Sequence, residues 1–376
     1  MSIRRLKASL KLPLAVLATV CGLTTHAMAC EFVESGYGPA GQGETRMQQI
    51  ATGLTVPWGI AFINDKDFLV TERPGRVRMF RDGRLVSEPV LRLNVETGGE
   101  GGLLGIAVHP DFSRNRLFYL YFTRRDENRV ERFRLSADGR SASADRVIMT
   151  GIPAGNVHDG GRIHFGPDGH LYIATGDTRN SNLSQNLNSK GGKLLRVTAD
   201  GEIPSGNPFG ESPVFMLGIR NVQGFDWINS STLILADHGP TGDTGRTGAD
   251  EVSIARPGSN LGWPGIYRCE EASSRVTPIL TWRQSVPPGG LVYYRGSMFP
   301  EWRGSAFIAT LRSKHLHRVA LNGTSLASHE TLLSNSFGRL REVVEAPDGS
   351  LLVTTSNCDG RGSCPRSKDV ILRMYR

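Results

Sequence analysis

The hydrophobic pattern of this chain consists of short apolar runs separated by turns. One unit recurs: an apolar run, a polar turn that often reads Pro-Asp-Gly, and a second run rich in Val, Ile, Leu, Tyr and Phe. Helical periodicity is nearly absent, so the runs are predicted to be β-strands joined as hairpins. The clear copies are 58–62 with 68–72, 105–111 with 117–121, 162–169 with 171–175, 222–227 with 232–236, and 341–349 with 351–355, and 304–309 is a fainter copy.

The repeat predicts the architecture. A lone hairpin cannot bury both of its faces, so each copy must stack on its neighbours. Six copies, spaced unevenly by roughly 40 to 80 residues, favour an all-β fold, a six-bladed β-propeller of four-stranded antiparallel sheets. A two-sheet sandwich is the structural alternative. No linker divides the chain, so residues 30–376 are expected to form a single domain.

The N-terminal segment is different in kind. Four cations precede or open an apolar run at 12–23, and Ala27, Met28 and Ala29 form a small-x-small cleavage site. Residues 1–29 are therefore predicted to be a secretory signal peptide cleaved after Ala29, which places the protein in a bacterial periplasm or outside the cell. The apolar run is too short to span a bilayer. Lipidation of Cys30 is an alternative, although the Leu usual three residues before a lipidated Cys is missing.

Charge argues against one class of partner. Removing the four cations of residues 1–29 lowers the formal charge from +8 to +4. No Lys/Arg run remains, so nucleic-acid binding gains no support.

Four cysteines remain after the signal peptide. An even number in an oxidising compartment suggests two disulfides, with three possible connectivities. Cys358 and Cys364 are neighbours in a Gly/Ser loop, which favours that pair and leaves Cys30 with Cys269; free thiols are the alternative. The absence of Cys-x-x-Cys or Cys/His spacing argues against a zinc site.

A histidine and an aspartate flank one predicted hairpin. His158 lies just before its first strand and Asp177 just after its second, so the hairpin brings them together. A carboxylate that fixes the tautomer of a histidine and stabilises its cation makes a general base. The alternative is a turn histidine that caps a strand.

Three other places concentrate groups for binding. Arg220 and Asn221 precede a strand and could stabilise a developing oxyanion. Arg339 and Arg341 lie on one side of a strand, where two guanidinium groups suit carboxylates. The Asp-His-Gly-Pro motif at 237–240, followed by acids at 250–251, offers the oxygen ligands that calcium takes, without EF-hand spacing. Solvated loops and a metal-free acidic loop are the alternatives.

Taken in order, these motifs resemble the soluble PQQ-dependent aldose sugar dehydrogenases, a propeller family that includes the soluble glucose dehydrogenases. PQQ is pyrroloquinoline quinone. The likeness runs from about Leu54 to Leu372. It rests on GGLLG at 101–105, VHPDF at 108–112, HDGGR at 158–162, GD at 176–177, LGIRN at 217–221, DHGP at 237–240, NLGWP at 260–264 and RLR at 339–341.

The resemblance implies a mechanism. The C1 hydroxyl of an aldose gives its proton to His158, held by Asp177, while the hydride passes to a carbonyl carbon of PQQ. Arg220 polarises that carbonyl, and Asn221 contacts the cofactor. Cations at the positions of Arg339 and Arg341 bind the PQQ carboxylates.

The resemblance also implies metal ligands. Backbone carbonyls of Gly239 and Pro240 match those that hold the PQQ-bound calcium, which makes the quinone electrophilic. Glu251 and the carbonyl of Leu261 match a second calcium site.

The chain departs from the family pattern at three places. Glu100 replaces a Gln that contacts PQQ, and an unpaired carboxylate there would repel the anionic cofactor. Arg312 replaces a Lys, which keeps the charge but changes the geometry. The segment 241–249 is longer than usual and puts the second metal site in question. Tyr267 and Trp282 are candidates for the pocket wall, with blade packing the alternative.

The sequence therefore predicts a quinoprotein dehydrogenase that oxidises aldoses to lactones and passes electrons to an external quinone or redox protein, as a monomer or homodimer. One alternative is a non-enzymatic binding propeller with a degenerate site. Another is a calcium-dependent propeller hydrolase, which would require a carboxylate-rich metal cage. Rossmann and Walker signatures are absent, which argues against nicotinamide or ATP chemistry.

Overall fold

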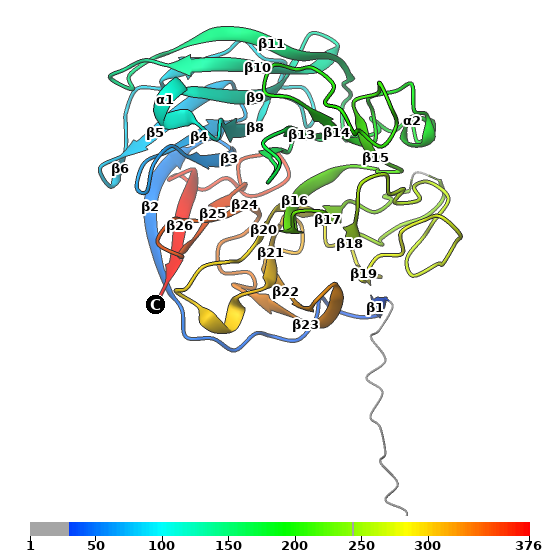
Figure 1. Cartoon of the computed structure of the whole chain (residues 1–376). Helices are drawn as coiled ribbons and strands as arrows, with labels where there is room; N and C mark the ends of the chain where they lie inside the picture. The colour runs from blue at the N-terminus through cyan, green and yellow to red at the C-terminus, as the bar shows by residue number, and fades with distance from the viewer. Residues whose placement is uncertain (1–29, 243) are drawn as a thin grey trace, which may run out of the picture.

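Six small sheets lie side by side in a ring in the computed structural model, which describes residues 30–242 and 244–376 (Figure 1). The predicted signal peptide, residues 1–29, lies outside these ranges. Helix is confined there to α1 (Phe112–Asn115), α2 (Asn182–Gln185) and the 3-10 turn η1 (Pro300–Trp302). None of these helices is long or apolar enough to cross a membrane. The predicted all-β, six-bladed propeller is confirmed.

Each blade begins with the strand nearest the centre, and the first strands of neighbouring blades pack together except between blades 3 and 4. Blade 1 contains β3 (Pro57–Phe62), β4 (Phe68–Glu72), β5 (Arg76–Arg81), β6 (Arg84–Leu85) and β7 (Leu91–Arg92), and blade 2 contains β8 (Leu103–Val108), β9 (Leu117–Arg124), β10 (Glu127–Leu135) and β11 (Ala142–Pro153). Blade 3 contains β12 (Ile163–Phe165), β13 (Leu171–Ala174), β14 (Lys193–Val197) and β15 (Val214–Leu217), and blade 4 contains β16 (Val222–Asn229), β17 (Thr232–Asp237), β18 (Glu251–Ala255) and β19 (Leu280–Trp282). Blade 5 contains β20 (Pro288–Tyr293), β21 (Ser305–Thr310), β22 (Leu316–Asn322) and β23 (Ser325–Leu332), and blade 6 contains β24 (Leu340–Glu345), β25 (Leu351–Thr355) and β26 (Asp369–Tyr375).

The N-terminal segment completes two blades. β2 (Arg46–Leu54) is the outermost strand of blade 6 and runs antiparallel to β26, so the two ends of the described chain close the ring. β1 (Glu31–Val33) pairs in parallel with β19 and gives blade 4 a fifth strand. In blade 1, β5 pairs with both β6 and β7. Four sheets thus have the predicted four strands, and two have five.

In blade 5 the predicted repeat corresponds to a different strand from that in the other blades. The faint copy at 304–309 is β21, the second strand of the blade, and the first strand is β20. β20 contains Gly289 and Gly290 because blade 6 approaches it closely. A Cβ on Gly289 would lie 2.3 Å from the Arg341 carbonyl oxygen. The two glycines dilute the apolar pattern, so the strand is not evident in the sequence.

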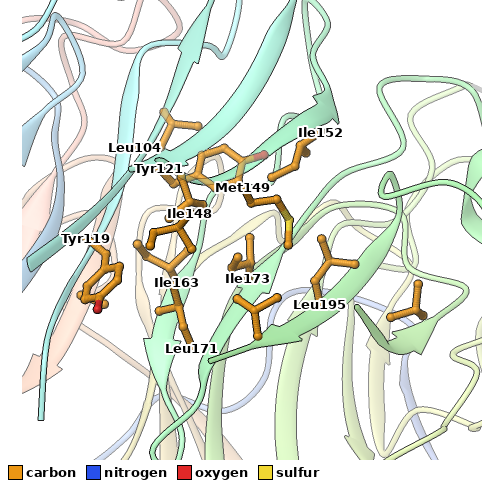
Figure 2. Close-up of a cluster of buried hydrophobic side chains, with 14 of the residues drawn as sticks. Leu104, Tyr119, Tyr121, Ile148, Met149, Ile152, Ile163, Leu171, Ile173 and Leu195 are labelled. Atoms are coloured by element: carbon orange, nitrogen blue, oxygen red, sulfur yellow. The ribbon is translucent and has the colours of Figure 1, made fainter. Parts of the chain in front are cut away.

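The core lies between the blades. Figure 2 shows such a cluster between blades 2 and 3, with Leu104, Tyr121, Ile163 and Leu195 among its buried residues. Each buried Leu or Ile contributes about 1.5–3 kcal/mol to stability. Tyr121 also donates a hydrogen bond to the Asp159 carbonyl at 2.6 Å. The same packing therefore fixes the loop that carries His158.

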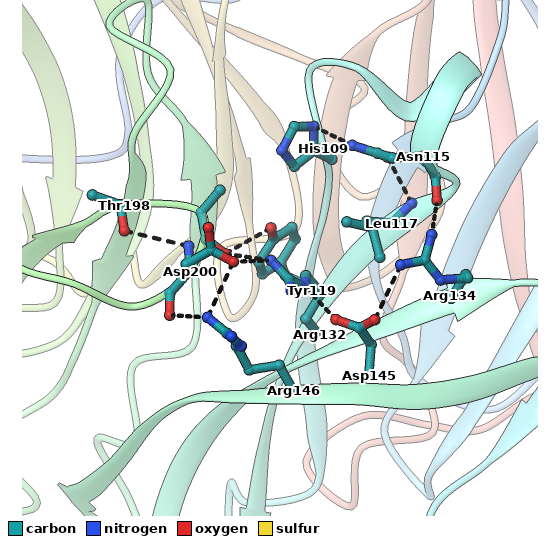
Figure 3. Close-up of polar contacts among 11 residues, drawn as sticks. His109, Asn115, Leu117, Tyr119, Arg132, Arg134, Asp145, Arg146, Thr198 and Asp200 are labelled. Atoms are coloured by element: carbon teal, nitrogen blue, oxygen red, sulfur yellow. Dashed lines mark hydrogen bonds and ion pairs between the residues drawn. The ribbon is translucent and has the colours of Figure 1, made fainter.

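A polar network joins the outer parts of the same two blades (Figure 3). Arg132 on β10 donates to Asp145 on β11 at 2.6 Å and to Asp200, in the turn after β14, at 2.8 Å. Arg146 reaches the same Asp200 carboxylate at 3.2 Å. Blades 2 and 3 are thus tied by an apolar interior and an ionic exterior.

Both predicted disulfides are present, Cys30–Cys269 and Cys358–Cys364. The first ties the N-terminal segment to a loop of blade 4, so the Cys30 sulfur is not free for lipidation. Two disulfides suggest an extracellular or periplasmic location.

Candidate active site

His158 and Asp177 form a buried hydrogen-bonded pair. His158 lies in the loop between β11 and β12, and Asp177 follows β13. Their Nδ1 and Oδ1 atoms are 2.6 Å apart, and the His158 side chain is 7% exposed. Nδ1–H donates to the carboxylate, which leaves the Nε2 lone pair of a neutral ring free. Nε2 has no hydrogen-bond partner among the described residues, so it can accept a proton from a bound molecule.

Trp263 fixes the carboxylate from the other side. Its Nε1–H donates to Asp177 Oδ2 at 2.8 Å, while the backbone N–H of Arg179 donates to Oδ1 at 2.9 Å. The orientation of the imidazole is thus set through Asp177 by residues of blades 3 and 4. Trp263 lies in the NLGWP motif, but nothing in the motif predicted its contact with Asp177.

The backbone of His158 is held in an uncommon conformation. Its φ is +62°, in the left-handed region that costs a non-glycine residue about 1 kcal/mol or more. Gly176 allows this loop to come close, because a Cβ there would lie 1.8 Å from the His158 carbonyl oxygen. The chain therefore places this histidine by close backbone packing.

Arg220 and Asn221 lie beside this pair, just before β16. Both backbone N–H groups donate to the Asp237 carboxylate, at 2.9 and 2.6 Å. Asn221 Oδ1 accepts the N–H of Gly160 at 3.0 Å, and its Nδ2 is buried without a partner in the described structure. The predicted cation and amide are thus both brought to the site, and one amide donor remains available.

A cavity, here called the arginine cavity, opens to solvent next to Asn221. Arg341 donates from NH1 to Gln223 at 2.9 Å, and its Nε is buried without a partner within the described ranges. Burial lowers the pKa of Arg341 to about 10, so it stays charged at neutral pH. The residues that define the cavity are Trp58, Arg73, Glu100, Gln223, Arg341 and Arg361.

Glu100 lies where this cavity meets the His158 loop. Its Oε2 accepts the His158 N–H at 2.9 Å, and its Oε1 accepts from Arg361 at 2.6 Å. Burial alone would raise the pKa of Glu100, but His238, Arg361 and the His158 N–H outweigh it and lower the pKa to about 2. Burial lowers the pKa of His238 to about 3, so at neutral pH Arg361 is the cation that neutralises Glu100.

Comparison with known proteins identifies the family. The model of the Glucose / Sorbosone dehydrogenase family matches residues 54–372. The chain belongs to this family. This dehydrogenase is accordingly an oxidoreductase that acts on sugar donors.

Individual relatives match over most of their length. The aldose sugar dehydrogenase YliI of Escherichia coli is 32% identical over 82% of this chain and 89% of its own. Quinoprotein glucose dehydrogenase B of Acinetobacter calcoaceticus is 26% identical, with 92% and 93% covered. The PQQ-bound form of the aldose sugar dehydrogenase from Streptomyces coelicolor superposes with a TM-score of 0.80 at 36% identity, covering 90% of this chain and 99% of that one.

A second cavity in the dehydrogenase, the carboxylate cavity, adjoins the first, and His238 lines both. The candidate calcium ligands of the two predicted sites all line it, so the fold gathers them around one space. The residues that define it are Arg220, Gly239, Pro240, Glu251, Leu261, Trp263 and Tyr267.

The acids at this cavity are crowded. Burial raises the pKa of Asp237 and of Asp250 to about 6, and burial together with these neighbours raises that of Glu251 well above its ordinary value. Asp237 and Asp250 each accept two backbone N–H groups, whereas Glu251 accepts, among the described residues, only from the Ser253 hydroxyl, at 3.3 Å. The described residues hold no group of three His, Cys, Asp or Glu side chains that could bind a metal together.

Several predicted residues lie away from the cavities or against other groups. Arg312 is exposed in the turn after β21 and lines neither cavity. Arg339 is buried behind the arginine cavity, where it binds Asp359 at 2.8 and 2.9 Å. Tyr267 lines the carboxylate cavity and donates to the Thr247 carbonyl at 2.5 Å, which anchors the described residues 244–249. Trp282 is buried between blades 4 and 5.

The predictions from sequence also missed residues that the fold brings to the arginine cavity. Arg73 comes from the turn after β4, and burial lowers its pKa. Gln223 connects the cavity to Gly160, whose carbonyl accepts from Nε2 at 2.9 Å. The spacing of Asn221, just before β16, and Gln223, in β16, was a usable signal, since residues two apart in an extended chain point the same way, and Gln223 Nε2 lies 3.4 Å from Asn221 Oδ1. No pattern in the sequence indicated Arg73 or Arg361.

Proposed function

We propose that this dehydrogenase oxidises aldose sugars at C1 to lactones, with PQQ in the arginine cavity and calcium in the carboxylate cavity. The electrons pass to an external acceptor, a quinone or a redox protein. The single observation that carries the proposal is a histidine with a free Nε2, fixed by a buried carboxylate, beside a cavity lined by arginines. The relatives named as PQQ-bound or quinoprotein dehydrogenases support it.

The arginine cavity suits a flat polycarboxylate. Asn221 Nδ2 and Arg341 Nε are buried donors that lack partners in the described chain, a costly arrangement unless a ligand accepts from them. Arg73, Arg341 and Arg361 supply charge, and Trp58 supplies an aromatic wall. Glu100 offsets the charge of Arg361, and Asp359 offsets that of Arg339, so Arg73 and Arg341 leave the cavity with a net positive charge.

The carboxylate cavity suits calcium by the chemistry of its donors. Glu251 is a buried carboxylate with one weak partner in the described part of the chain, next to Asp237 and Asp250, and a divalent cation would relieve their mutual repulsion. Backbone carbonyls of Gly239, Pro240 and Leu261 are the expected further ligands. This oxygen-rich set matches a hard cation and does not match zinc.

The residues of the chain supply the acid–base chemistry. When bound, PQQ supplies the electrophilic carbonyl that accepts the sugar hydride. His158 Nε2 takes the proton of the C1 hydroxyl, and Asp177 stabilises the resulting imidazolium. Arg220 offers positive charge beside the reacting groups, and the buried position of His158 excludes bulk water.

A dye-reduction assay on purified apoprotein tests the proposal, with PQQ and calcium added or omitted across a panel of aldoses. Turnover is expected only with both additions, and His158→Ala should lower it about 10²–10⁴-fold. Absence of turnover together with absence of PQQ binding by absorbance titration would instead favour a non-catalytic binding propeller. Sedimentation of the same protein distinguishes a monomer from a homodimer.

A further inference from the structure

A loop closed by the Cys358–Cys364 disulfide forms one wall of the arginine cavity. Two of its residues, Asp359 and Arg361, line the cavity directly. The loop follows β25 and was expected from the sequence only to carry a disulfide. Its charged residues give it a role in the site.

The base of this loop is firmly fixed. Asp369 accepts the N–H groups of Asn357 and Cys358 at 2.6 and 3.2 Å, and it also accepts from the Thr355 hydroxyl. Asp359 binds the Arg339 guanidinium and accepts the N–H of Arg361 at 2.9 Å. The backbone at Arg361 is therefore held by hydrogen bonds as well as by the disulfide.

Arg361 reaches from this loop to Glu100. Its NH1 is 2.6 Å from Glu100 Oε1, and the arginine side chain is 54% exposed against 24% for the glutamate. Nε and NH2 of Arg361 make no hydrogen bond within the described structure, so they remain as donors at the cavity. Glu100 in turn accepts the backbone N–H of His158. One ion pair thus connects the disulfide loop to the loop of the candidate base.

We propose that Arg361 is a cofactor-binding residue with two roles, and that the Cys358–Cys364 disulfide holds it in position at the cavity. It neutralises Glu100, and its remaining donors bind a carboxylate of the anionic cofactor. This inference rests on the proposed function, since PQQ is its ligand.

Titration of apoprotein with PQQ, followed by tryptophan fluorescence, tests the two roles in four proteins: wild type, Arg361→Gln, Glu100→Gln and the double variant. Arg361→Gln removes a cation and leaves a carboxylate unpaired, so its Kd should rise about 30-fold or more. Glu100→Gln should change Kd by less than about 3-fold. In the Glu100→Gln background the Arg361 change should cost only about 5-fold, because no carboxylate is left unpaired.

The outcomes separate the possible failures. Arg92→Gln, which removes an exposed arginine paired with Glu88, is the matched control and should leave Kd unchanged. A Kd of Arg361→Gln equal to that of wild type would overturn the inference. Equal losses in both backgrounds would overturn the neutralising role. If wild type itself binds no PQQ, the proposed function fails first and the four Kd values cannot be compared.

The disulfide is tested by replacing Cys358 and Cys364 together with Ser. The freed loop should weaken PQQ binding several-fold in wild type, since ordering it on binding costs entropy. In the Arg361→Gln background the same change should have no further effect. An equal effect in both backgrounds would show that the disulfide does not act through Arg361.

Discussion

Asp177 accepts hydrogen bonds from three donors: the His158 ring, the Trp263 indole and the Arg179 backbone. With both oxygens engaged, the carboxylate has one available orientation. The histidine is therefore held with Nδ1 protonated and Nε2 free, which is the tautomer that a base requires. At this scale the candidate chemistry depends on a contact made by a residue, Trp263, that touches no reacting atom.

Replacing Asp177 by Asn tests this dependence. The amide keeps the size but can donate to Nδ1, which favours the wrong tautomer and no longer stabilises the imidazolium. We expect kcat to fall about 10²–10⁴-fold, with Kd for PQQ unchanged. Dye-reduction rates at saturating PQQ measure this change in kcat. Asp168→Asn, at the more exposed His170–Asp168 pair, is the control and should keep the wild-type rate. A rate for Asp177→Asn within 3-fold or so of wild type would contradict the assignment.

The sequence revealed those residue pairs that one hairpin brings together. His158 and Asp177 are 19 positions apart and flank a single strand–turn–strand unit, so their contact followed from local pattern. Glu100 and Arg361 are 261 positions apart, on blades at opposite ends of the chain. Only closure of the ring makes them neighbours, and no local pattern encodes that. Arg312 is a different case. It was expected near the cofactor from the resemblance alone, and the fold leaves it exposed.

At the scale of elements, five of the six predicted hairpins are the two inner strands of a blade. These strands are buried on both faces, so they read as apolar runs. The outer strands are more exposed, such as β11, in which five consecutive residues face solvent, so they carry no such signal. β1 and β2 were missed for another reason: their partners are at the far end of the sequence, so their pairing is purely tertiary.

The two disulfides are expected to stabilise the fold unequally. Cys30–Cys269 spans 239 positions and Cys358–Cys364 spans 6, and chain entropy makes the longer loop the more effective constraint. Replacing the first pair by Ser should lower the unfolding free energy by about 5 kcal/mol, and the second by about 2 kcal/mol. Guanidinium denaturation without reductant measures both. Equal losses would show that the N-terminal segment is ordered without its disulfide.

At the scale of the whole molecule, the ring assembles the site from parts that are unrelated in sequence. Loops from blades 1, 2, 4, 5 and 6 line the arginine cavity, and His158 enters between blades 2 and 3. β2 holds blade 6 to the N-terminal end of the chain, so it also holds the disulfide loop in place. Stability of the ring and geometry of the site are therefore coupled.

Acidification should weaken the ring through a buried chain of histidines. His315 Nε2 lies 3.1 Å from His317 Nδ1, His317 Nε2 lies 3.2 Å from His329 Nδ1, and His329 reaches Glu31 of β1 at 3.0 Å. The chain thus connects blade 5 to the N-terminal segment. Burial lowers the pKa of His315 to about 4, and that of His317 well below its ordinary value.

The direction of this pH dependence of stability follows from proton uptake by the unfolded chain. An unfolded histidine titrates near pH 6.5, whereas His315 in the folded state stays neutral down to about 4, so between these values unfolding takes up a proton. The unfolding free energy should therefore fall as pH is lowered through 6.5, by about 2 kcal/mol at pH 5 from His315 alone. His315→Asn should be less stable at pH 7 but lose about 2 kcal/mol less between pH 7 and 5. Buried acids such as Asp237 titrate in both proteins, so the difference between their denaturation curves isolates His315. Parallel losses in the two proteins would mean that His315 takes up its proton without unfolding, and that the histidine chain opens to water inside an intact ring.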